Sequence, residues 1–504
     1  MNKRFLYGFS GGKTLYISTR GNIEKQTSAE VIALGMVPTG GLFVPENIPE
    51  VNWQDYKDLD YANLAYNIMK LYLQDLPAEN IASAVKVYSD GRFNGYNPVP
   101  LVDVGSYGFL ELWHGPTAAF KDMALQVLPH LLTSSIRTLG LDSEVLILTA
   151  TSGDTGKAAL EGFKDVSGTR IVVFYPAGGV SHVQERQMTT TDGRNTHVVA
   201  VNGNFDQCQT AVKKVFASDE LRKKFNESNI ILSSANSINW GRLLPQIVYY
   251  FWAYLQTVAQ GKINAGEKIN IVVPTGNFGN ILAAYYAKRM GLPIANLICA
   301  SNKNNVLTDF FHCGIYNSNR PFYLTYSPSM DILISSNFER FIFEMTGRDG
   351  EKVSSLFTRL ATEGIFEVDS ITLEKCRQNM IAGWAQESSV LESINIVYKE
   401  HGYVLDPHTA VGWKVYMDYR EKNDDDTYTV ITSTASPFKF AETVLLALKG
   451  GDNKNYDPWL ALNELSDMTG WEIPTGLKKL QSMPVRHNNK CDPEKIASYV
   501  LAFA

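Results

Sequence analysis

Two stretches of the sequence decide the fold: Val145-Leu-Ile-Leu-Thr149 with the turn Thr151-Ser-Gly-Asp-Thr-Gly156, and Ile271-Val-Val273 with the turn Pro274-Thr-Gly-Asn-Phe-Gly-Asn280. In each, a short apolar run leads through a glycine-rich turn into a helix-like segment. Glycines at such turns let the backbone approach an anion, and the N–H groups at a helix start favour negative charge. Neither turn has the Walker or the full dinucleotide-binding pattern. Together they predict two anion sites, although each alone is also explained as ordinary punctuation between strand and helix.

Short apolar runs alternate with helix-like segments between residues 145 and 300. Because these runs are continuously apolar, we expect strands covered on both faces, as in a doubly wound parallel α/β sheet. The predicted strands are Val145–Thr149, Ile171–Phe174, His197–Val201, Ile230–Leu232, Ile269–Val273 and Leu297–Ala300. A further strand, Tyr428–Thr432, returns to the sheet and brings Ser433 and Thr434 to the carboxyl edge, where ligands bind in such folds.

The composition limits the classes of function. The chain has 504 residues, 45% of them hydrophobic, and a formal net charge of −6. This charge provides no basic surface for nucleic acid or an anionic membrane, and the longest apolar stretch, Ile247–Leu255, is too short to cross a bilayer. The cysteines are widely spaced and the histidines lack zinc-ligand spacing. We therefore expect reduced thiols, no metal site and a cytoplasmic protein that acts on a small molecule.

The segment Leu112-Trp-His-Gly-Pro-Thr-Ala-Ala-Phe-Lys-Asp122 places Lys121 beside apolar residues. A lysine that acts as a Schiff-base nucleophile must lose its proton, which burial and nearby positive charge favour. The segment resembles the cofactor-lysine motif of the threonine synthase family, whose members depend on pyridoxal 5'-phosphate. Other blocks also resemble those of the family, in the same order: Tyr16–Gly21, Gly40–Glu46, Thr151–Gly156, Asn236–Arg242, Thr275–Asn280 and Ser433–Phe440.

The resemblance implies a fold and a domain organisation. The fold is a two-lobed, doubly wound α/β core of mostly parallel sheets, the fold type II of pyridoxal-phosphate enzymes, similar to the tryptophan synthase β chain. We expect an N-terminal threonine-synthase domain (1–98), a catalytic region (99–450) and a C-terminal extension (451–504). The catalytic region would contain a smaller mobile lobe near 122–202 and a helical insertion near 320–400. The expected helices include Tyr61–Leu76, Leu243–Leu255, Ile281–Met290, Glu339–Met345 and Leu373–Gln386.

The resemblance also implies a cofactor site. Lys121 would hold pyridoxal 5'-phosphate, Thr434 would meet the pyridine nitrogen with its hydroxyl, and Asp154 would lie near the phenolic oxygen in a positioning role. Converging N–H groups of one glycine turn would bind the cofactor phosphate. The residues of this turn are Gly276, Asn277, Phe278, Gly279 and Asn280. The two asparagines are also explained as turn formers, and Asp122 is expected to cap a helix rather than to pair with a distant cation.

A second anion site is implied for the substrate phosphate or carboxylate. Its residues are Ser152, Thr155, Asn236, Ser237 and Arg242. A guanidinium can bind a phosphate through two parallel hydrogen bonds, and we expect Arg242 to face an open cleft. The alternative is an arginine that snorkels or forms an ion pair at the protein surface.

The implied reaction converts O-phospho-L-homoserine and water to L-threonine and phosphate. Lys121 would remove the Cα proton, assist loss of a Cβ proton as phosphate leaves Cγ, and return a proton to Cα after water adds at Cβ. Two alternatives stay open. One is a phospho-lyase that releases 2-oxobutyrate, ammonia and phosphate, and the other is a catalytically inactive homologue that only binds ligands. The protein is expected to be a monomer or a homodimer.

One block departs from the family pattern Ala-His-Pro-Ala-Lys-Phe. The chain has Ala435-Ser-Pro-Phe-Lys-Phe440, so Ser436 replaces an imidazole and Phe438 replaces a small residue. If the histidine only packs, the reaction type is unchanged. If it tunes the site, the rate, pH profile or substrate of this chain would differ.

Overall fold

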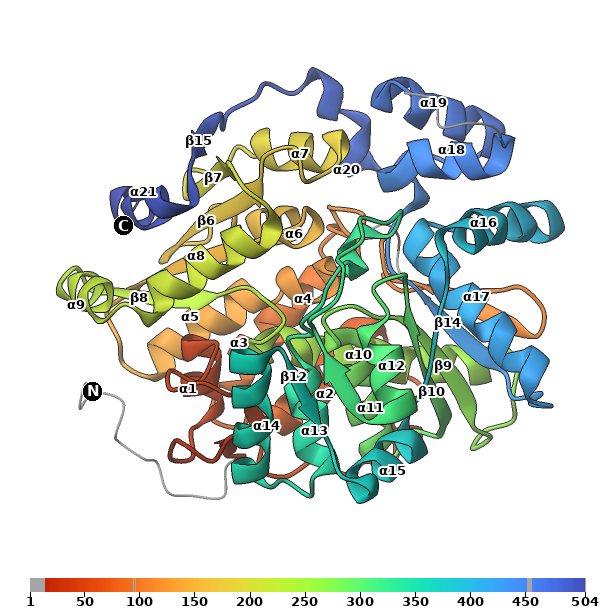
Figure 1. Cartoon of the computed structure of the whole chain (residues 1–504), viewed down its shortest axis with the longest axis horizontal. Helices are drawn as coiled ribbons and strands as arrows, with labels where there is room; N and C mark the ends of the chain where they lie inside the picture. The colour runs from red at the N-terminus through yellow and green to blue at the C-terminus, as the bar shows by residue number, and fades with distance from the viewer. Residues whose placement is uncertain (1–13, 94, 96, 451–455, 504) are drawn as a thin grey trace.

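The computed structural model describes residues 14–93, 95, 97–450 and 456–503. Two large sheets form its core (Figure 1). The six-stranded sheet has the order β13 (Ile381–Trp384), β10 (Ile294–Ser301), β9 (Ile269–Pro274), β14 (Thr429–Ser433), β4 (Tyr107–Glu111) and β3 (Leu101–Asp103). The five-stranded sheet has the order β15 (Asn489–Cys491), β7 (Thr196–Val201), β6 (Thr169–Pro176), β5 (Glu144–Ala150) and β8 (Ile230–Ser234). All neighbouring strands are parallel except β3 and β4.

The prediction of a doubly wound, mostly parallel α/β fold is confirmed, and each predicted strand is present. Every residue of β9 and of β14 is buried, as the continuous apolar runs indicated. Both glycine turns lie at the carboxyl end of a strand and open a helix. β5 leads into α6 (Asp154–Phe163), and β9 leads into α11 (Gly279–Arg289). The two turns come from different sheets, so the predicted anion sites face each other between the lobes.

Further helices surround the sheets (Figure 1). They are α4 (Asp122–Leu125), α5 (Leu128–Thr138), α7 (His182–Thr189), α8 (Phe205–Ala217), α9 (Asp219–Glu227), α10 (Trp240–Ala259), α12 (Val306–Cys313), α16 (Glu387–His401), α17 (Pro407–Lys422) and α20 (Thr475–Lys478). α10 contains the predicted helix 243–255 and packs against α11. No helix in the described ranges is long and apolar enough to cross a membrane.

The N-terminal residues pack onto the catalytic region. β1 (Tyr16–Ser18) pairs with β2 (Phe43–Pro45), α1 (Ser28–Leu34) packs on α5, and α2 (Tyr61–Tyr72) packs on α10. α3 (Ala78–Val85) follows α2, which ends four residues before the predicted end at 76. Buried side chains of this part belong to the same apolar cluster as those of α10 and α11. The domain boundary near 98 stays a prediction.

The prediction of one helix over Leu373–Gln386 is wrong. α15 ends at Asn379, and the next residues form β13, which pairs with β10 at the edge of the six-stranded sheet. Gly383 lets this strand pack closely on α17, because a Cβ there would lie 2.8 Å from Cγ1 of Val415. The other predicted helix of this region is α13 (Phe338–Met345). Around it lie α14 (Gly350–Glu363), α15 (Ser370–Asn379), and the hairpin of β11 (Ile315–Asn317) and β12 (Ile365–Glu367).

The C-terminal residues connect the two lobes. α18 (Ala441–Lys449) packs against α16, and α19 (Pro458–Thr469) packs against α18. The chain, blue in Figure 1, then runs across the molecule to β15 and α21 (Ile496–Phe503), where β15 pairs with β7 and α21 packs on α8. The second sheet therefore contains a strand from the end of the chain.

A fully buried arginine, Arg340, joins the N-terminal residues to the core through hydrogen bonds. Nε of Arg340, in α13, donates to the carbonyl oxygen of Phe43 at 2.9 Å. Its Nη2 donates to the carbonyl oxygen of Ile238 at 2.6 Å, and its Nη1 to Oδ1 of Asn337 at 2.6 Å. One side chain thus joins β2, α13 and the segment before α10.

We expect Arg340→Met to lower the free energy of unfolding by about 3 kcal/mol or more, because it leaves several buried acceptors without a donor. Urea denaturation followed by circular dichroism measures this change. Arg359→Met is the control. Arg359 pairs with Glu363 on the exposed face of α14, so its loss should cost less than about 1 kcal/mol. Equal effects of the two changes would contradict this role of Arg340.

Candidate active site

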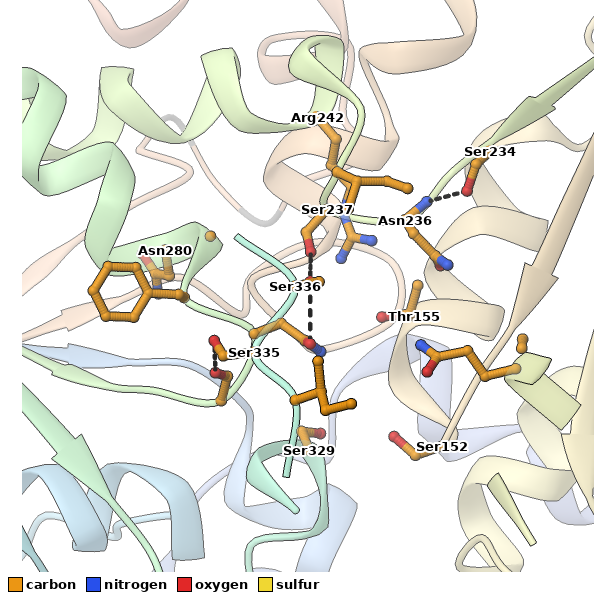
Figure 2. Close-up of a pocket in the computed structure, with 18 of the residues that line it drawn as sticks. Ser152, Thr155, Ser234, Asn236, Ser237, Arg242, Asn280, Ser329, Ser335 and Ser336 are labelled. Carbon is orange, nitrogen blue, oxygen red and sulfur yellow. Dashed lines mark hydrogen bonds between the residues drawn. The ribbon is translucent and has the colours of Figure 1, made fainter. Parts of the chain in front are cut away.

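A cavity of about 450 Å³ lies between the two lobes. It is lined by all the residues that the sequence nominated: Lys121, Ser152, Asp154, Thr155, Asn236, Ser237, Arg242, Gly276, Asn277, Phe278, Gly279, Asn280 and Thr434. Figure 2 shows side chains from both sheets converging on this space. The structure therefore brings the nominated residues together, and their individual roles stay predictions.

Backbone pairing fixes Lys121 relative to Thr434. The N–H of Phe120 donates to the carbonyl oxygen of Thr434 at 2.8 Å, and the N–H of Ser436 donates to that of Ala118 at 3.1 Å. Ala118 has a φ of 58°, in the left-handed region that non-glycine residues rarely adopt. This strained turn lets the loop before Lys121 run alongside the segment after β14. The lysine and the threonine hydroxyl therefore keep a fixed separation.

The Lys121 side chain is buried beside a carboxylate. Its Nζ lies 3.3 Å from Oδ2 of Asp154 and 4.6 Å from the centre of the Phe120 ring. Burial lowers the pKa of Lys121; the Asp154 charge opposes this shift, and the charges of Lys439 and Arg242 add to it. The net pKa is below the ordinary value. A lysine with a lowered pKa is unprotonated more often, as a nucleophile or general base requires.

Asp154 is the most connected side chain of the site. Its Oδ1 accepts hydrogen bonds from Gln184 Nε2 at 3.0 Å and lies 2.7 Å from Lys439 Nζ, while its Oδ2 accepts from Ser329 Oγ at 2.8 Å. Burial alone would raise the pKa of Asp154, but the Lys439 and Lys121 charges lower it, and the net pKa is well below the ordinary value. Asp154 is therefore an ionised carboxylate held from several directions.

The sequence motifs did not point to Ser329 and His408, which line the cavity, or to the buried Lys439. Lys439 lies within the block Ser433–Phe440, where a lysine between two phenylalanines is a signal of a buried charge. Ser329 and His408 gave no such signal. Nε2 of His408 accepts the N–H of Ser329 at 3.1 Å, while its Nδ1 lies 2.8 Å from Oδ1 of Asp406. These partners place the proton on Nδ1, so the ring acts as an acceptor that fixes the Ser329 loop.

The start of α11 provides an anion cradle. Phe278 precedes it with a φ of 64°, and no side chain caps the helix. The side chain of Asn280 is buried, and its Oδ1 accepts the hydroxyls of Tyr249 and Tyr250. These bonds direct the amide, and its Nδ2 has no hydrogen-bond partner in the described part of the chain. A buried donor without a partner, next to free N–H groups at a helix start, fits a phosphate group.

The other end of the cofactor site fits as well. A Cβ on Gly276 would lie 3.0 Å from Cα of Met330, so glycine lets these two segments approach closely. Thr434 is buried and lines the cavity, and within residues 14–93, 95, 97–450 and 456–503 its hydroxyl has no hydrogen-bond partner. This hydroxyl can face a ring nitrogen. Lysine, phosphate cradle and hydroxyl together fit pyridoxal 5'-phosphate.

The second anion region lies at the ends of β5 and β8, which are neighbours in the five-stranded sheet. Ser152 and Thr155 follow β5, and Asn236 and Ser237 follow β8 (Figure 2). The hydroxyl oxygen of Ser237 accepts a hydrogen bond from Nδ2 of Asn337 at 2.9 Å, so the O–H of Ser237 points away from Asn337. These polar side chains are only partly buried, and they surround space rather than one another.

The expectation that Arg242 faces an open cleft is wrong. It is 5% exposed, and its Nη1 donates to the carbonyl oxygen of Ala235 at 2.8 Å. Burial lowers its pKa to about 10. The surface alternative is also wrong, because the side chain extends from the start of α10 toward the cavity (Figure 2). A buried guanidinium without a carboxylate partner is costly unless an anion completes its shell.

The predictions for two neighbouring residues also change. Asp122 does not cap a helix: its carboxylate accepts the N–H and the hydroxyl of Thr117, both at 2.8 Å, and burial raises its pKa to about 7. It therefore closes the loop before Lys121. Ser436, which replaces the family's histidine, is fully buried and caps a short helix by accepting the N–H of Phe438. Ser436 does not line the cavity.

Comparisons with known proteins identify the family. Residues 15–87 match the model "Threonine synthase N terminus", residues 105–434 match "Pyridoxal-phosphate dependent enzyme", and residues 409–500 match "Threonine synthase, C-terminal". The chain belongs to the pyridoxal-phosphate-dependent threonine synthase family. This membership confirms the resemblance noted from the sequence motifs, the fold type II core and the cofactor.

Relatives from several organisms support the same family. The threonine synthase of Saccharomyces cerevisiae is 37% identical over 90% of this chain and 93% of its own length. Human threonine synthase-like 1 is 41% identical over 86% of this chain, which spans only 61% of that protein. A pyridoxal-phosphate-bound threonine synthase from Brucella melitensis superimposes with a TM-score of 0.85 at 35% identity, covering 97% of this chain and 99% of that one.

We expect Arg242→Ala to reduce kcat/KM for the phosphorylated substrate at least ~10-fold, because a charged hydrogen bond contributes about 1.5–3 kcal/mol. The yellow colour of bound cofactor should remain. Arg194→Ala, at an exposed side chain, is the control. Full activity of Arg242→Ala, or loss of cofactor together with activity, would contradict two separate anion sites.

Proposed function

We propose that this protein is a threonine synthase, which converts O-phospho-L-homoserine and water to L-threonine and phosphate. The observation that carries the proposal is the position of Lys121 between two separate anion-binding turns, one from each sheet. One turn would take the cofactor phosphate and the other the substrate phosphate. A site with two phosphate subsites around one lysine suits a phosphorylated amino acid better than an unphosphorylated one.

The two subsites differ in the donors they offer. The cradle of Gly276–Asn280 uses N–H groups and the Asn280 amide, which suit a permanently bound phosphate. The substrate subsite adds the Arg242 guanidinium to the hydroxyls of Ser152, Thr155 and Ser237. A guanidinium can stabilise the negative charge that grows on the phosphate as it leaves. This division assigns leaving-group recognition to the second subsite.

The net change of the reaction sets what the residues must do. At Cγ, the bond to the phosphate oxygen breaks and a proton is gained; at Cβ, a proton is lost and the hydroxyl of water is gained. Cα loses a proton and regains it. Pyridoxal 5'-phosphate supplies an electron-withdrawing ring joined to the substrate amine, which makes the Cα proton acidic.

Lys121 is proposed as the group that moves these protons. Its Nζ is buried in the cavity, is linked to Asp154 at 3.3 Å, and has a lowered pKa because of burial. The released phosphate can exchange protons at Cγ, where it departs. Thr434 would contact the ring nitrogen with a hydroxyl, which does not hold that nitrogen protonated as a carboxylate would. A moderate electron sink of this kind suits chemistry that proceeds from Cα to the side chain.

The proposal extends to the setting of the protein. It is a cytoplasmic enzyme with a small-molecule substrate, and a monomer or homodimer. The net charge of −6 supports a partner other than nucleic acid or an anionic membrane. The phospho-lyase and the inactive homologue are less favoured, because the lysine and both anion turns are intact and the relatives of matching length are named threonine synthases.

A product assay tests the activity. With purified protein, cofactor and O-phospho-L-homoserine, we expect L-threonine and phosphate in equal amounts, measured by amino-acid analysis and phosphate release. Lys121→Ala should fold but fall at least ~10³-fold in rate, since it removes the acting base. Phosphate released with 2-oxobutyrate would favour the phospho-lyase. Turnover by Lys121→Ala at the wild-type rate would exclude the assigned base.

A second prediction concerns Ser436. Because this residue is buried outside the cavity, Ser436→His should leave the ratio of threonine to 2-oxobutyrate unchanged. The larger ring should instead lower the midpoint of thermal unfolding, as overpacking costs about 1–3 kcal/mol. Product analysis and thermal denaturation of the same variant give both values. A change of the main product would show that the family's histidine tunes the reaction.

A further inference from the structure

Lys439 is a charged side chain that the proposed chemistry does not use. It is fully buried and does not line the cavity. Its Nζ donates to the carbonyl oxygen of Thr117 at 3.1 Å and lies 2.7 Å from Oδ1 of Asp154. A buried ammonium is costly unless it is paired and hydrogen-bonded. The fold therefore places this charge against Asp154 at an energetic cost, which calls for a functional explanation.

The two oxygens of the Asp154 carboxylate face different partners. Oδ1 faces Lys439, and Oδ2 lies 3.3 Å from Nζ of Lys121. Two buried lysines thus share one buried carboxylate. If both lysines were protonated, this group would carry one uncompensated positive charge, so loss of a proton from one of them is favoured.

The contacts decide which lysine keeps its proton. Lys439 has the shorter distance to the carboxylate and a carbonyl acceptor in addition. Lys121 has one longer contact and faces the Arg242 guanidinium, whose charge disfavours a second cation. Lys439 is therefore the better stabilised ammonium, and Lys121 is the lysine that gives up its proton.

We propose that Lys439 is a positioning residue that neutralises the charge of the Asp154 carboxylate and so keeps Lys121 unprotonated and nucleophilic. The inference rests on the proposed role of Lys121 as the cofactor lysine. Without Lys439, Asp154 would keep Lys121 as its one lysine partner among the described residues and would hold it as an ion pair. An ammonium in such a pair can neither attack the cofactor aldehyde nor accept a proton.

Other charged and titratable groups surround this cluster. Arg242 faces it from α10, and His408 faces Asp154 from α17. Asp122 lies close enough for Lys439 to lower its pKa, although burial raises that pKa more strongly. None of these groups lies between Lys439 and Asp154, which are in direct contact. Lys439 therefore acts on Lys121 in two ways, by pairing with the Asp154 carboxylate and by direct repulsion between the two positive charges.

The test measures the protonation of Lys121 in the full chain after the cofactor is removed with hydroxylamine. Trace acetylation at a series of pH values, read by mass spectrometry of the Lys121 peptide, gives its titration curve. Lys439→Met should raise the pKa of Lys121 by about one unit, which is ~10-fold slower acetylation at a pH below the pKa. Asp154→Asn should move the curve the opposite way. The double variant Lys439→Met with Asp154→Asn should return close to wild type.

Matched controls separate this effect from a structural one. Lys157→Met removes a buried lysine that pairs with Glu161 on α6, the helix that Asp154 begins, and it should leave the Lys121 curve unchanged. The rate at which yellow colour returns on adding pyridoxal 5'-phosphate should fall for Lys439→Met and stay at the wild-type value for Lys157→Met. If Lys439→Met does not fold, adding it to Asp154→Asn should still raise the pKa of Lys121.

Two results would overturn the proposal. One is an unchanged Lys121 curve in Lys439→Met, and the other is a shift of both single variants in the same direction, which a mere loss of packing would produce. The outcome is independent of the product of the reaction. Opposite shifts in a protein that makes no threonine would sustain the role of Lys439 and reject the proposed function.

Discussion

The ionised carboxylate of Asp154 is the contact on which the site depends. It begins α6 in one lobe, and it binds Gln184 from α7, Ser329 from the loop before α13, and Lys439 from the segment after β14. A carboxylate at this depth is stable only when cations and donors surround it. Each element that supplies a partner must therefore reach the same point. This requirement holds the two sheets in fixed positions on either side of Lys121.

The same constraint explains how one cavity can bind two phosphates. The cofactor cradle at α11 and the hydroxyl-rich ends of β5 and β8 belong to different sheets, and Lys121 and Asp154 lie between them. Arg242 supplies positive charge on the substrate side, and no carboxylate partner neutralises it among the contacts of the described residues. The Arg242 charge is therefore available to an anionic group of the substrate, whereas N–H groups would bind the cofactor phosphate.

Much of the fold and of the site follows from local sequence. Continuous apolar runs predicted the parallel strands, and the motifs placed every nominated residue on the cavity wall. The features that were not predicted depend on tertiary contacts. β13 is short and depends on close packing of Gly383 against Val415, and Lys439 and Ser329 meet Asp154 only after distant segments fold together. Burial of Arg242 likewise depends on tertiary contacts, which no window of local sequence contains.

The central claim is that two anion sites flank one lysine. A crystal structure with pyridoxal 5'-phosphate and a phosphonate analogue of O-phospho-L-homoserine tests it most directly. We expect the cofactor phosphate on Gly276–Asn280, the cofactor ring between Lys121 and Thr434, and the phosphonate within hydrogen-bond distance of Arg242 and Ser237. Both anions on the α11 cradle, or the phosphonate remote from Arg242, would contradict the division of the cavity into cofactor and substrate sides.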